Sequence, residues 1–93
     1  HLSHVYDTGG SLYVTVVAKR DNNDPVGQWQ AAKVAACDAI VAAGATITHH
    51  HAVGRDHAPW LAAEVGDNGI ELLRAIKAHL DPDDTLNPGA LLR

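Results

Sequence analysis

The hydrophobic period of this chain changes once along its length, and this change limits the folds that it can form. Residues 11–19 alternate between apolar and polar side chains, which indicates a half-buried strand. Beyond Pro25 the apolar residues recur every three to four positions, which indicates amphipathic helices. Short strands followed by helices are typical of the α+β class. The chain is therefore expected to be α+β, with short antiparallel strands and helices packed on one face.

Turn and capping residues divide the first half of the chain. An extended segment over residues 1–6 is followed by the turn sequence DTGG and then by the strand at residues 11–19. A helix is expected over residues 25–43 for three reasons. Asp24 can cap its free amides, the proline after Asp24 suits a first helical position, and Gly44 suits the position just past the end.

The second half is expected to hold one extended segment, two helices and an irregular tail. Residues 45–51 look extended, and Pro59 is expected to open a short helix that stops at Gly66. A second helix continues to Leu80, where an Asp-Pro pair ends it. The tail over residues 83–93 contains Asn-Pro-Gly, a sequence typical of a turn.

Large side chains that could fill a core are scarce. Alanine accounts for sixteen of the 93 residues, Phe and Met are absent, and the aromatic residues are two Trp and two Tyr. A chain of this length buries only about 60 to 65% of the surface that it exposes when unfolded. We therefore expect a thin core, exposed apolar surface and self-association of the segment. Since the sequence starts with His and contains no Met, it is expected to be a fragment of a longer chain.

Charge and cysteine content exclude several classes of function. A net charge of −4 provides no cationic face for a phosphate backbone, so nucleic-acid binding is not expected. The alanine-rich residues 31–45 include Lys33 and Asp38, and they fall short of the roughly 20 apolar residues of a transmembrane helix. The single cysteine, Cys37, excludes an intramolecular disulfide and a cysteine-based zinc site. It is expected to be a small buried residue, and a lone thiol is typical of a cytoplasmic protein.

Three consecutive histidines, His49, His50 and His51, are the most concentrated chemistry in the chain. In extended backbone His49 and His51 point to one side and His50 points to the other. Imidazoles titrate near neutral pH and therefore suit proton transfer, or donation to an oxyanion or a phosphate. Two alternatives stay open. The histidines could be hydrogen-bonded residues at a strand end, or His57 could join His49 and His51 in a metal site.

Two further side chains could act beside the histidines. Arg55 offers a bidentate donor for a phosphate or a carboxylate, and a surface ion pair with Asp56 or Glu64 is the alternative. Tyr13 lies on the more polar face of its expected strand, where its phenol could pass a proton to or from a substrate. The alternative for Tyr13 is that its ring only packs against other side chains, with its hydroxyl at the edge of the packed region.

Four motifs, taken in order, carry a resemblance to a known family. They are SHVYDTG at residues 3–9, SLY at 11–13, GATITHHHAVGRDH at 44–57, and LDP followed by LNPG between 80 and 89. The chain resembles the C-terminal end of FAD-linked oxidases of the vanillyl-alcohol-oxidase superfamily, and most of all the alkyldihydroxyacetonephosphate synthase branch. The resemblance covers essentially the whole chain, and the histidine triplet followed by a small residue, Val and Gly is its most specific part.

The resemblance implies that residues 1–93 form part of the cap domain and the C-terminal tail of a larger flavoenzyme. The FAD-binding domain, and FAD with it, would belong to the preceding part of the polypeptide, which is the expected partner of this segment. The family exchanges the acyl group of acyl-dihydroxyacetone phosphate for a long-chain alcohol, through a covalent adduct on the flavin and without net redox. The related possibility is an FAD-dependent oxidoreductase of small 2-hydroxy acids such as lactate or glycolate.

Family roles carry over onto the matching residues. The active-site tyrosine of the family, a proton donor and acceptor, matches Tyr13, and its histidine triplet near the reacting centre matches His49–His51. The basic residue after the Val-Gly pair matches Arg55, which is expected to bind substrate. Asn87, from the Asn-Pro-Gly motif, is the expected contact to the cofactor, and no metal is expected.

Three departures from the family pattern bear on these roles. Ala52 stands where Gly is usual, so a left-handed backbone is not expected there. Ala90 stands where the wider family often has Lys, which weakens the expected contact between the tail and the cofactor. The glycine-rich loops that hold the phosphates of FAD are missing from this sequence, so the segment alone is not expected to bind flavin.

Overall fold

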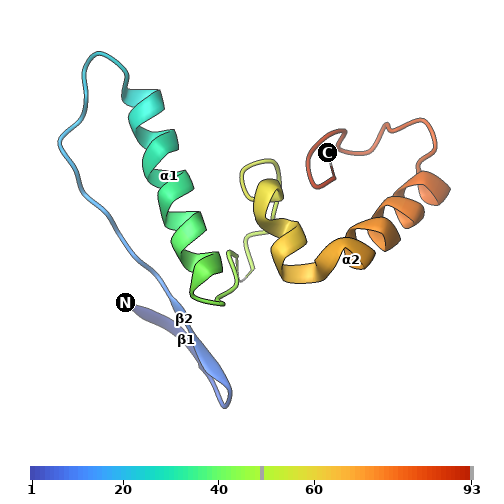
Figure 1. The fold of residues 1–93 in the computed structure, drawn as a ribbon, viewed down its shortest axis with the longest axis horizontal. Helices are drawn as coiled ribbons and strands as arrows, with labels where there is room; N and C mark the ends of the chain where they lie inside the picture. The colour runs from blue at the N-terminus through green and yellow to red at the C-terminus, as the bar shows by residue number, and fades with distance from the viewer. Residues whose placement is uncertain (49, 93) are drawn as a thin grey trace. The chain divides into compact units, whose positions relative to one another are not determined.

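The computed structural model of the chain describes residues 1–48 and 50–92. Its elements in order are β1 (Leu2–Tyr6), β2 (Gly9–Leu12), α1 (Pro25–Ala42) and α2 (Ala58–Leu80) (Figure 1). The expected α+β class is confirmed, while the packing of the helices on one face of the sheet stays a prediction. The chain forms two compact units, His1–Ala32 and Lys33–Arg93.

The hairpin at the start of the chain is antiparallel. Leu2 pairs with Leu12 and Tyr6 pairs with Gly9, with an irregularity in register between Leu2 and His4. A tight turn joins the two strands, as the sequence DTGG predicts. The hairpin is the whole sheet within the described residues.

The strand expected over residues 11–19 is wrong beyond its second residue, because β2 ends at Leu12. The chain then runs without regular secondary structure to the start of α1 (Figure 1). Val14 and Val16 are each 80% exposed, and Val17 is 91% exposed. An alternating pattern states only that one face suits burial, whereas a strand also needs a partner for its backbone N–H and C=O groups. The Tyr13 amide still bonds to the His1 carbonyl, but no described strand pairs with residues 14–19.

Helix α1 begins and ends almost where its capping residues predict, one residue short of the expected C-terminus. The Gly27 amide donates to Asp24 Oδ1 at 2.9 Å, which confirms Asp24 as the cap. At the other end Gly44 has a φ of 71°. The Gly44 amide donates to the Val41 carbonyl at 2.9 Å and the Ala45 amide to the Ile40 carbonyl at 3.1 Å. These two bonds form a Schellman motif.

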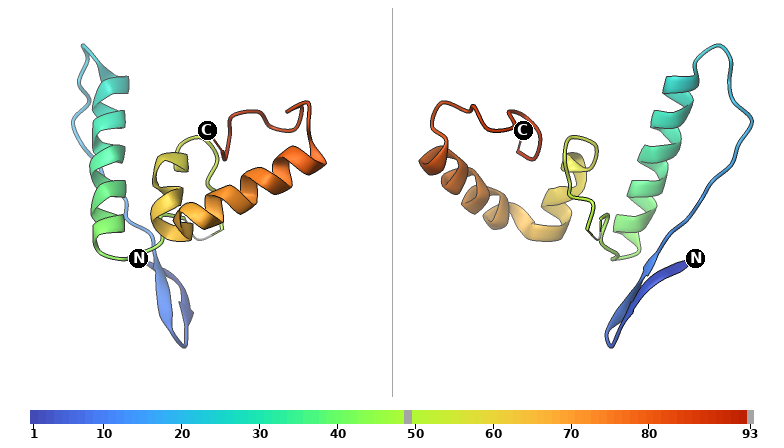
Figure 2. Two further views of the ribbon diagram at one scale, coloured as in Figure 1. Left: turned by 45° about the vertical axis from the view of Figure 1, so that its right-hand side comes forward. Right: turned by 180° about the vertical axis from the view of Figure 1, so that it is seen from behind.

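Helix α2 is interrupted where a stop was expected. Gly66 has φ 72° and ψ 167°, outside the helical region, and the element bends there (Figures 1 and 2). The two expected helices are therefore the two arms of α2, one from Ala58 to the bend and one from the bend to Leu80. Asp81 ends the second arm as predicted, and its amide donates to the Lys77 carbonyl.

The extended segment expected over residues 45–51 is wrong for its described part. Residues 45, 46 and 48 have no regular structure, and Ile47, His50 and His51 lie in bends. Extended backbone needs neighbouring strands to satisfy its polar groups, and in this segment side chains satisfy some of them instead.

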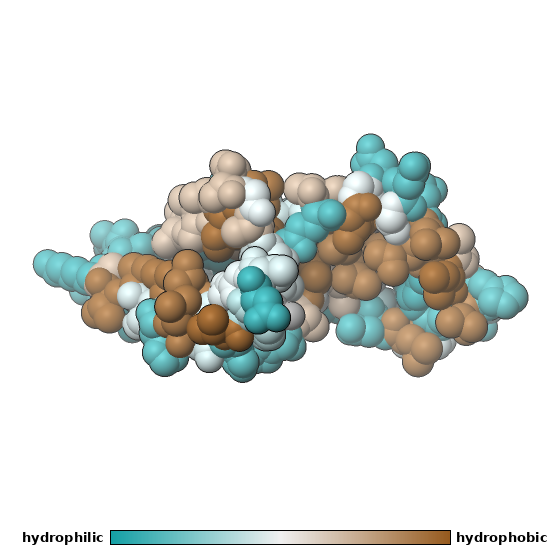
Figure 3. All heavy atoms as spheres, turned by 90° about the horizontal axis from the view of Figure 1, so that it is seen from below, coloured by the Kyte–Doolittle hydropathy of each residue, from teal (hydrophilic) through white to brown (hydrophobic). Residues whose placement is uncertain are grey.

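The core is as thin as the composition predicts. Among the described residues the buried apolar side chains are Cys37, Leu61 and Ala90, and the buried polar one is Asp81. Many Leu and Val side chains, and that of Ile76, remain at the surface, and residues of these types are brown in Figure 3. Trp29 on α1 is 56% exposed and is therefore not core filler. Neither described helix is long and apolar enough to cross a membrane.

Candidate functional site

Residues 45–57, which join α1 to α2, carry the histidines and are called the histidine loop below. Its first part is bonded to the first arm of α2. The Ile47 amide donates to Glu64 Oε1 at 2.5 Å, and the Thr46 hydroxyl donates to Glu64 Oε2 at 2.9 Å. Both oxygens of one carboxylate are thus used by the residues that immediately precede the triplet.

Two of the three histidines contact each other. The ring centroids of His50 and His51 lie 4.3 Å apart with the ring planes at 89°, an edge-to-face arrangement. The expectation that His50 points away from His51 is therefore wrong, because it assumed extended backbone and the residues lie in bends. Both side chains are exposed and accessible to a substrate. His49 lies outside the described residues.

The backbone after the triplet is left-handed at two positions. Ala52 has a φ of 69° and Gly54 a φ of 59°. The expectation that Ala52 avoids this region is wrong: the tight backbone that glycine usually supplies is formed here by alanine, with the strain that this implies. The His57 amide donates to the Val53 carbonyl at 3.2 Å and closes the turn.

The end of the loop is bonded to α1 by contacts that sequence reasoning missed. Lys33 Nζ lies 3.2 Å from His57 Nε2 and 3.9 Å from an Asp56 carboxylate oxygen. Since an ammonium group only donates, this bond requires His57 to carry its proton on Nδ1. Trp60 Nε1 donates to Asp38 Oδ1 at 2.7 Å. These pairs are separated by 22 to 24 residues, and no local pattern signals them.

Arg55 joins the histidine loop to the C-terminal tail. Its Nη2 donates to the Pro88 carbonyl at 3.0 Å. The ion pair of Arg55 with Asp56 or Glu64, the alternative from the sequence, is not among the salt bridges of the described residues. A guanidinium carries five N–H donors in a fixed plane, and the Pro88 carbonyl accepts from one of them.

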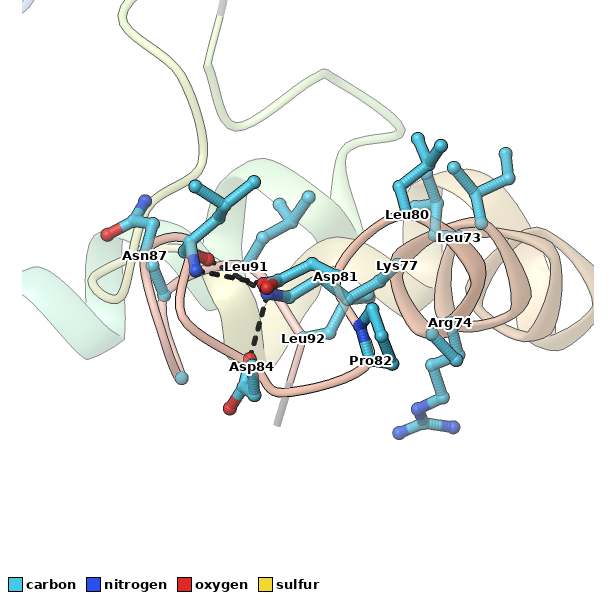
Figure 4. A pocket seen from close by; sticks show the side chains of 15 residues that line it. Leu73, Arg74, Lys77, Leu80, Asp81, Pro82, Asp84, Asn87, Leu91 and Leu92 are labelled. Carbon is cyan, nitrogen blue, oxygen red and sulfur yellow. Dashed lines mark hydrogen bonds and ion pairs between the residues drawn. The ribbon is translucent and has the colours of Figure 1, made fainter.

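The tail is folded back along the second arm of α2 by a single buried carboxylate (Figure 1). Asp81 Oδ1 accepts from the amide and the hydroxyl of Thr85, each at 2.9 Å, and Oδ2 accepts from the Leu86 amide at 2.9 Å. Lys77 donates to Asp81, to Asp84 Oδ1 at 2.8 Å and to the Leu86 carbonyl at 2.9 Å. Figure 4 shows Lys77, Asp81 and Asp84 gathered beside the groove described below.

The hydrogen bonds of this cluster shift the pKa values of Asp81 and Lys77. The hydrogen bond from Lys77 holds the pKa of the Asp81 carboxyl well below its usual range, with help from the Leu86 and Thr85 backbone amides and against the effect of burial. Hydrogen bonds to Asp81 and Asp84 raise the pKa of Lys77. Asp81 therefore stays ionised and holds the tail at any physiological pH.

An open apolar groove of about 660 Å³ lies between the second arm of α2 and the tail. Leucines of both segments line it, and its charged and polar side chains come from Arg74, Lys77, Asp81, Asp84 and Asn87. Asn87 itself has a φ of 49°, a left-handed conformation that asparagine tolerates. Its amide is directed away from the Lys77 cluster in Figure 4.

Tyr13 follows the last residue of β2. Its amide donates to the His1 carbonyl at 2.8 Å, and its ring meets the His1 ring edge-on, with centroids 6.2 Å apart. The Tyr13 side chain is 41% exposed, so its phenol is accessible. Tyr13 belongs to the first unit and the histidine loop to the second. Their convergence on one cleft stays a prediction.

The described residues offer neither a group of metal ligands nor a phosphate-binding loop for FAD. No group of three His, Cys, Asp or Glu side chains within them could hold a metal ion, and the trio considered from the sequence includes His49. Left-handed glycines stand singly, at Gly44, Gly54, Gly66 and Gly89, and not in a glycine-rich loop between a strand and a helix. The described residues thus do not fit the pyrophosphate of FAD.

Comparison with known proteins identifies relatives along the whole chain. Residues 1–91 match the family of FAD linked oxidases, C-terminal domain. The chain is 35% identical over 92 residues to the alkyldihydroxyacetonephosphate synthase of Dictyostelium discoideum and 30% identical over 92 residues to that of Trypanosoma brucei brucei. Each alignment covers 99% of this chain and 15% of the synthase.

A relative that is named for a different activity is also similar to the chain. The glycolate oxidase subunit GlcD of Bacillus subtilis is 33% identical over 82 residues, which is 88% of this chain and 17% of that protein. The chain therefore spans less than a fifth of the length of each of these relatives. No solved structure matches it.

Proposed function

Because this chain belongs to the family of FAD linked oxidases, C-terminal domain, we propose that it is the substrate-side segment of a larger enzyme similar to alkyldihydroxyacetonephosphate synthase. The complete enzyme would exchange the acyl group of acyl-dihydroxyacetone phosphate for a fatty alcohol, a step of ether-lipid synthesis. The observation that carries the proposal is an identity of 30 to 37% with three such synthases over 87 to 99% of the chain.

The partner of the segment, in this proposal, is the rest of its own polypeptide. The described residues do not fit FAD, and the chain spans only 15% of the synthases' length, so FAD and its binding domain are assigned to the remainder. Asn87 is proposed as the point where the tail reaches the cofactor. Its place at the polar rim of an open apolar groove supports this, because such a surface suits contact with another domain.

The exchange defines what this chain's side chains must do. The oxygen of the alcohol replaces the carboxylate on the substrate carbon, and the proton of the alcohol hydroxyl leaves with the carboxylic acid. A group that accepts one proton and returns it is therefore needed, and we assign this role to the accessible Tyr13 phenol. His49, His50 and His51 would donate hydrogen bonds to the phosphate or to a developing oxyanion.

Arg55 is proposed to bind the phosphate of the substrate with donors that the Pro88 carbonyl does not use. The contact with Pro88 supports this role in one respect, because it restricts the guanidinium beside the histidine loop. A side chain held in place loses less conformational entropy when a ligand binds.

A second candidate is an FAD-dependent oxidoreductase of small 2-hydroxy acids. The identity of 33% with a glycolate oxidase subunit and of 30% with a probable D-lactate dehydrogenase of Danio rerio favours it. In that enzyme the histidines would bind the substrate carboxylate and take the hydroxyl proton.

The two candidates predict different reactions of the complete enzyme. The synthase is expected to form an ether lipid from acyl-dihydroxyacetone phosphate and a fatty alcohol, and to leave its flavin oxidised when D-lactate or glycolate is added. Rapid bleaching of the flavin by either hydroxy acid, without ether formation, would reject the synthase in favour of the oxidoreductase.

The role of Tyr13 is tested by removing its hydroxyl. Tyr13→Phe is expected to lower turnover by about a hundredfold or more, with flavin content unchanged, since a positioned proton donor is worth about that factor. Tyr6→Phe is the matched control, because Tyr6 lies in the same hairpin and is 51% exposed. Equal turnover of Tyr13→Phe and Tyr6→Phe would show that Tyr13 does not transfer the proton and only packs.

A further inference from the structure

We propose that Glu64 is the positioning residue for His50 and His51. Its carboxylate holds Thr46 and Ile47, and so sets where the imidazoles of His50 and His51 lie. The inference rests on the proposed function, in which the triplet contacts the substrate. It assigns a role to a side chain of α2 that none of the sequence motifs includes.

The geometry of the contact is that of a clamp. Glu64 Oε1 accepts from the Ile47 amide at 2.5 Å and Oε2 accepts from the Thr46 hydroxyl at 2.9 Å, so the carboxylate is bidentate across two consecutive residues. The contacts span 17 and 18 residues of sequence. Hydrogen bonds to an ionised acceptor are shorter and about twice as strong as those between neutral groups.

The clamp acts on the part of the loop before the triplet, and other contacts hold the part after it. Beyond the triplet, the loop is held by Arg55 on Pro88, by the His57 amide on Val53 and by Lys33 on His57. Before the triplet, the backbone has left α1, and Thr46 and Ile47 both bond to Glu64.

Fixing both ends also accounts for the strained alanine between them. Ala52 is left-handed, a conformation that an L-residue keeps only where its surroundings leave no alternative. Releasing residues 46 and 47 would let the loop move the strain out of Ala52 and carry the histidines with it. Displacements of about 1 Å at a reacting group can lower a rate by about a hundredfold.

The experiment uses the complete enzyme and two readouts, one of which does not depend on the reaction. Glu64→Ala is expected to speed hydrogen exchange of the Ile47 amide by about tenfold or more. The same variant is expected to lower kcat by about ten- to a hundredfold with KM little changed. Glu64→Gln keeps one acceptor oxygen and is expected to fall between Glu64→Ala and the unaltered enzyme on both readouts.

Glu71→Ala is the matched control. Glu71 is also a glutamate of α2, but it pairs with Arg74 one turn away on an exposed surface, at 2.9 Å. It is expected to leave both the Ile47 exchange rate and kcat unchanged. If Glu64→Ala behaves like Glu71→Ala on either readout, or if Glu64→Gln is as impaired as Glu64→Ala in kcat, the positioning role is wrong.

Histidine variants separate this proposal from the proposed function. His50→Ala and His51→Ala are expected to lower kcat, with His79→Ala on the exposed surface of α2 as control. If they lower kcat while Glu64→Ala does not, the triplet acts and the clamp does not. If neither histidine variant lowers kcat, the proposed function fails, and faster Ile47 exchange in Glu64→Ala would then show a purely structural bond and overturn the positioning role as well.

Discussion

Replacing Ala52 with glycine is expected to stabilise the histidine loop. The φ of 69° at Ala52 costs an L-residue about 1 to 2 kcal/mol, because its Cβ approaches the following carbonyl oxygen. Glycine removes this cost. Its greater conformational freedom in the unfolded chain, however, lowers the stability of the folded loop by about 0.5 to 1 kcal/mol. The net gain for Ala52→Gly is about 0.5 to 1 kcal/mol, which slows local opening by about two- to fivefold.

Gly54 provides a matched change of opposite sign two residues later. Its φ is 59°, and no atom lies within 4 Å of the Cβ that an alanine would add, so Gly54→Ala alters backbone strain without a clash. The same arithmetic predicts that Gly54→Ala destabilises the loop by about 0.5 to 1 kcal/mol. Gly9 also has open space but no positive φ, and Gly9→Ala in the hairpin is expected to be close to neutral.

The assay is hydrogen exchange of the His57 amide in the complete enzyme, since its bond to the Val53 carbonyl closes the turn that contains Gly54 and that begins one residue after Ala52. Ala52→Gly should slow this exchange and Gly54→Ala should speed it. Two shifts in the same direction, or faster exchange in Ala52→Gly, would show that left-handed strain does not govern the loop.

Three further outcomes are expected. Asp24→Ala should cost α1 about 1 kcal/mol, seen as faster exchange of the Gly27 amide, whereas Asp24→Asn should keep the cap; equal losses would contradict the capping argument. The pKa of Asp81 is lowered on folding and that of Lys77 is raised, so their bonds to the tail should persist from pH 4 to 10 and weaken only below the usual 3.8 or above the usual 10.5. The measurement is the pH dependence of the NMR chemical shifts of the Thr85 and Leu86 amides. A titration of these shifts between pH 4 and 10 would contradict the prediction. Finally, the segment alone should sediment as concentration-dependent oligomers, because apolar side chains such as Val14 and Leu80 are exposed; a monomer at high concentration would argue against this.

Signals that act over a few residues predicted the fold well. Asp24, Gly44 and Gly66 each mark a helix boundary or bend where the structure has one, because a cap or a left-handed glycine determines its own neighbourhood. The strand beyond Leu12 failed because alternation at residues 13–19 reports a preference for burial and not the presence of a pairing partner.

The sequence suggests which residues form the candidate site, and their roles stay predictions, but it does not reveal the contacts that hold them. The triplet, Tyr13 and Arg55 stand out by residue type and by the family motifs that contain them. Glu64 and Lys33 do not, because each acts on the loop through a contact across 17 or more residues. A glutamate on a polar helix face and a lysine in an alanine-rich helix carry no local sign of such a partner.

The second unit is ordered by polar contacts more than by apolar burial. Among the residues that the structure describes, its buried apolar ones are Cys37, Leu61 and Ala90. The bonds of Glu64 and of the Trp60–Asp38 pair join residues 17 to 22 positions apart, and Asp81 holds the tail through bonds to residues four and five positions away. Such bonds gain strength when water is excluded from them, because the local dielectric constant falls. Covering the exposed leucines of α2 and the tail with the rest of the polypeptide would therefore do more than bury apolar surface. It would also stiffen the carboxylates of Glu64 and Asp81, which hold the histidine loop and the tail.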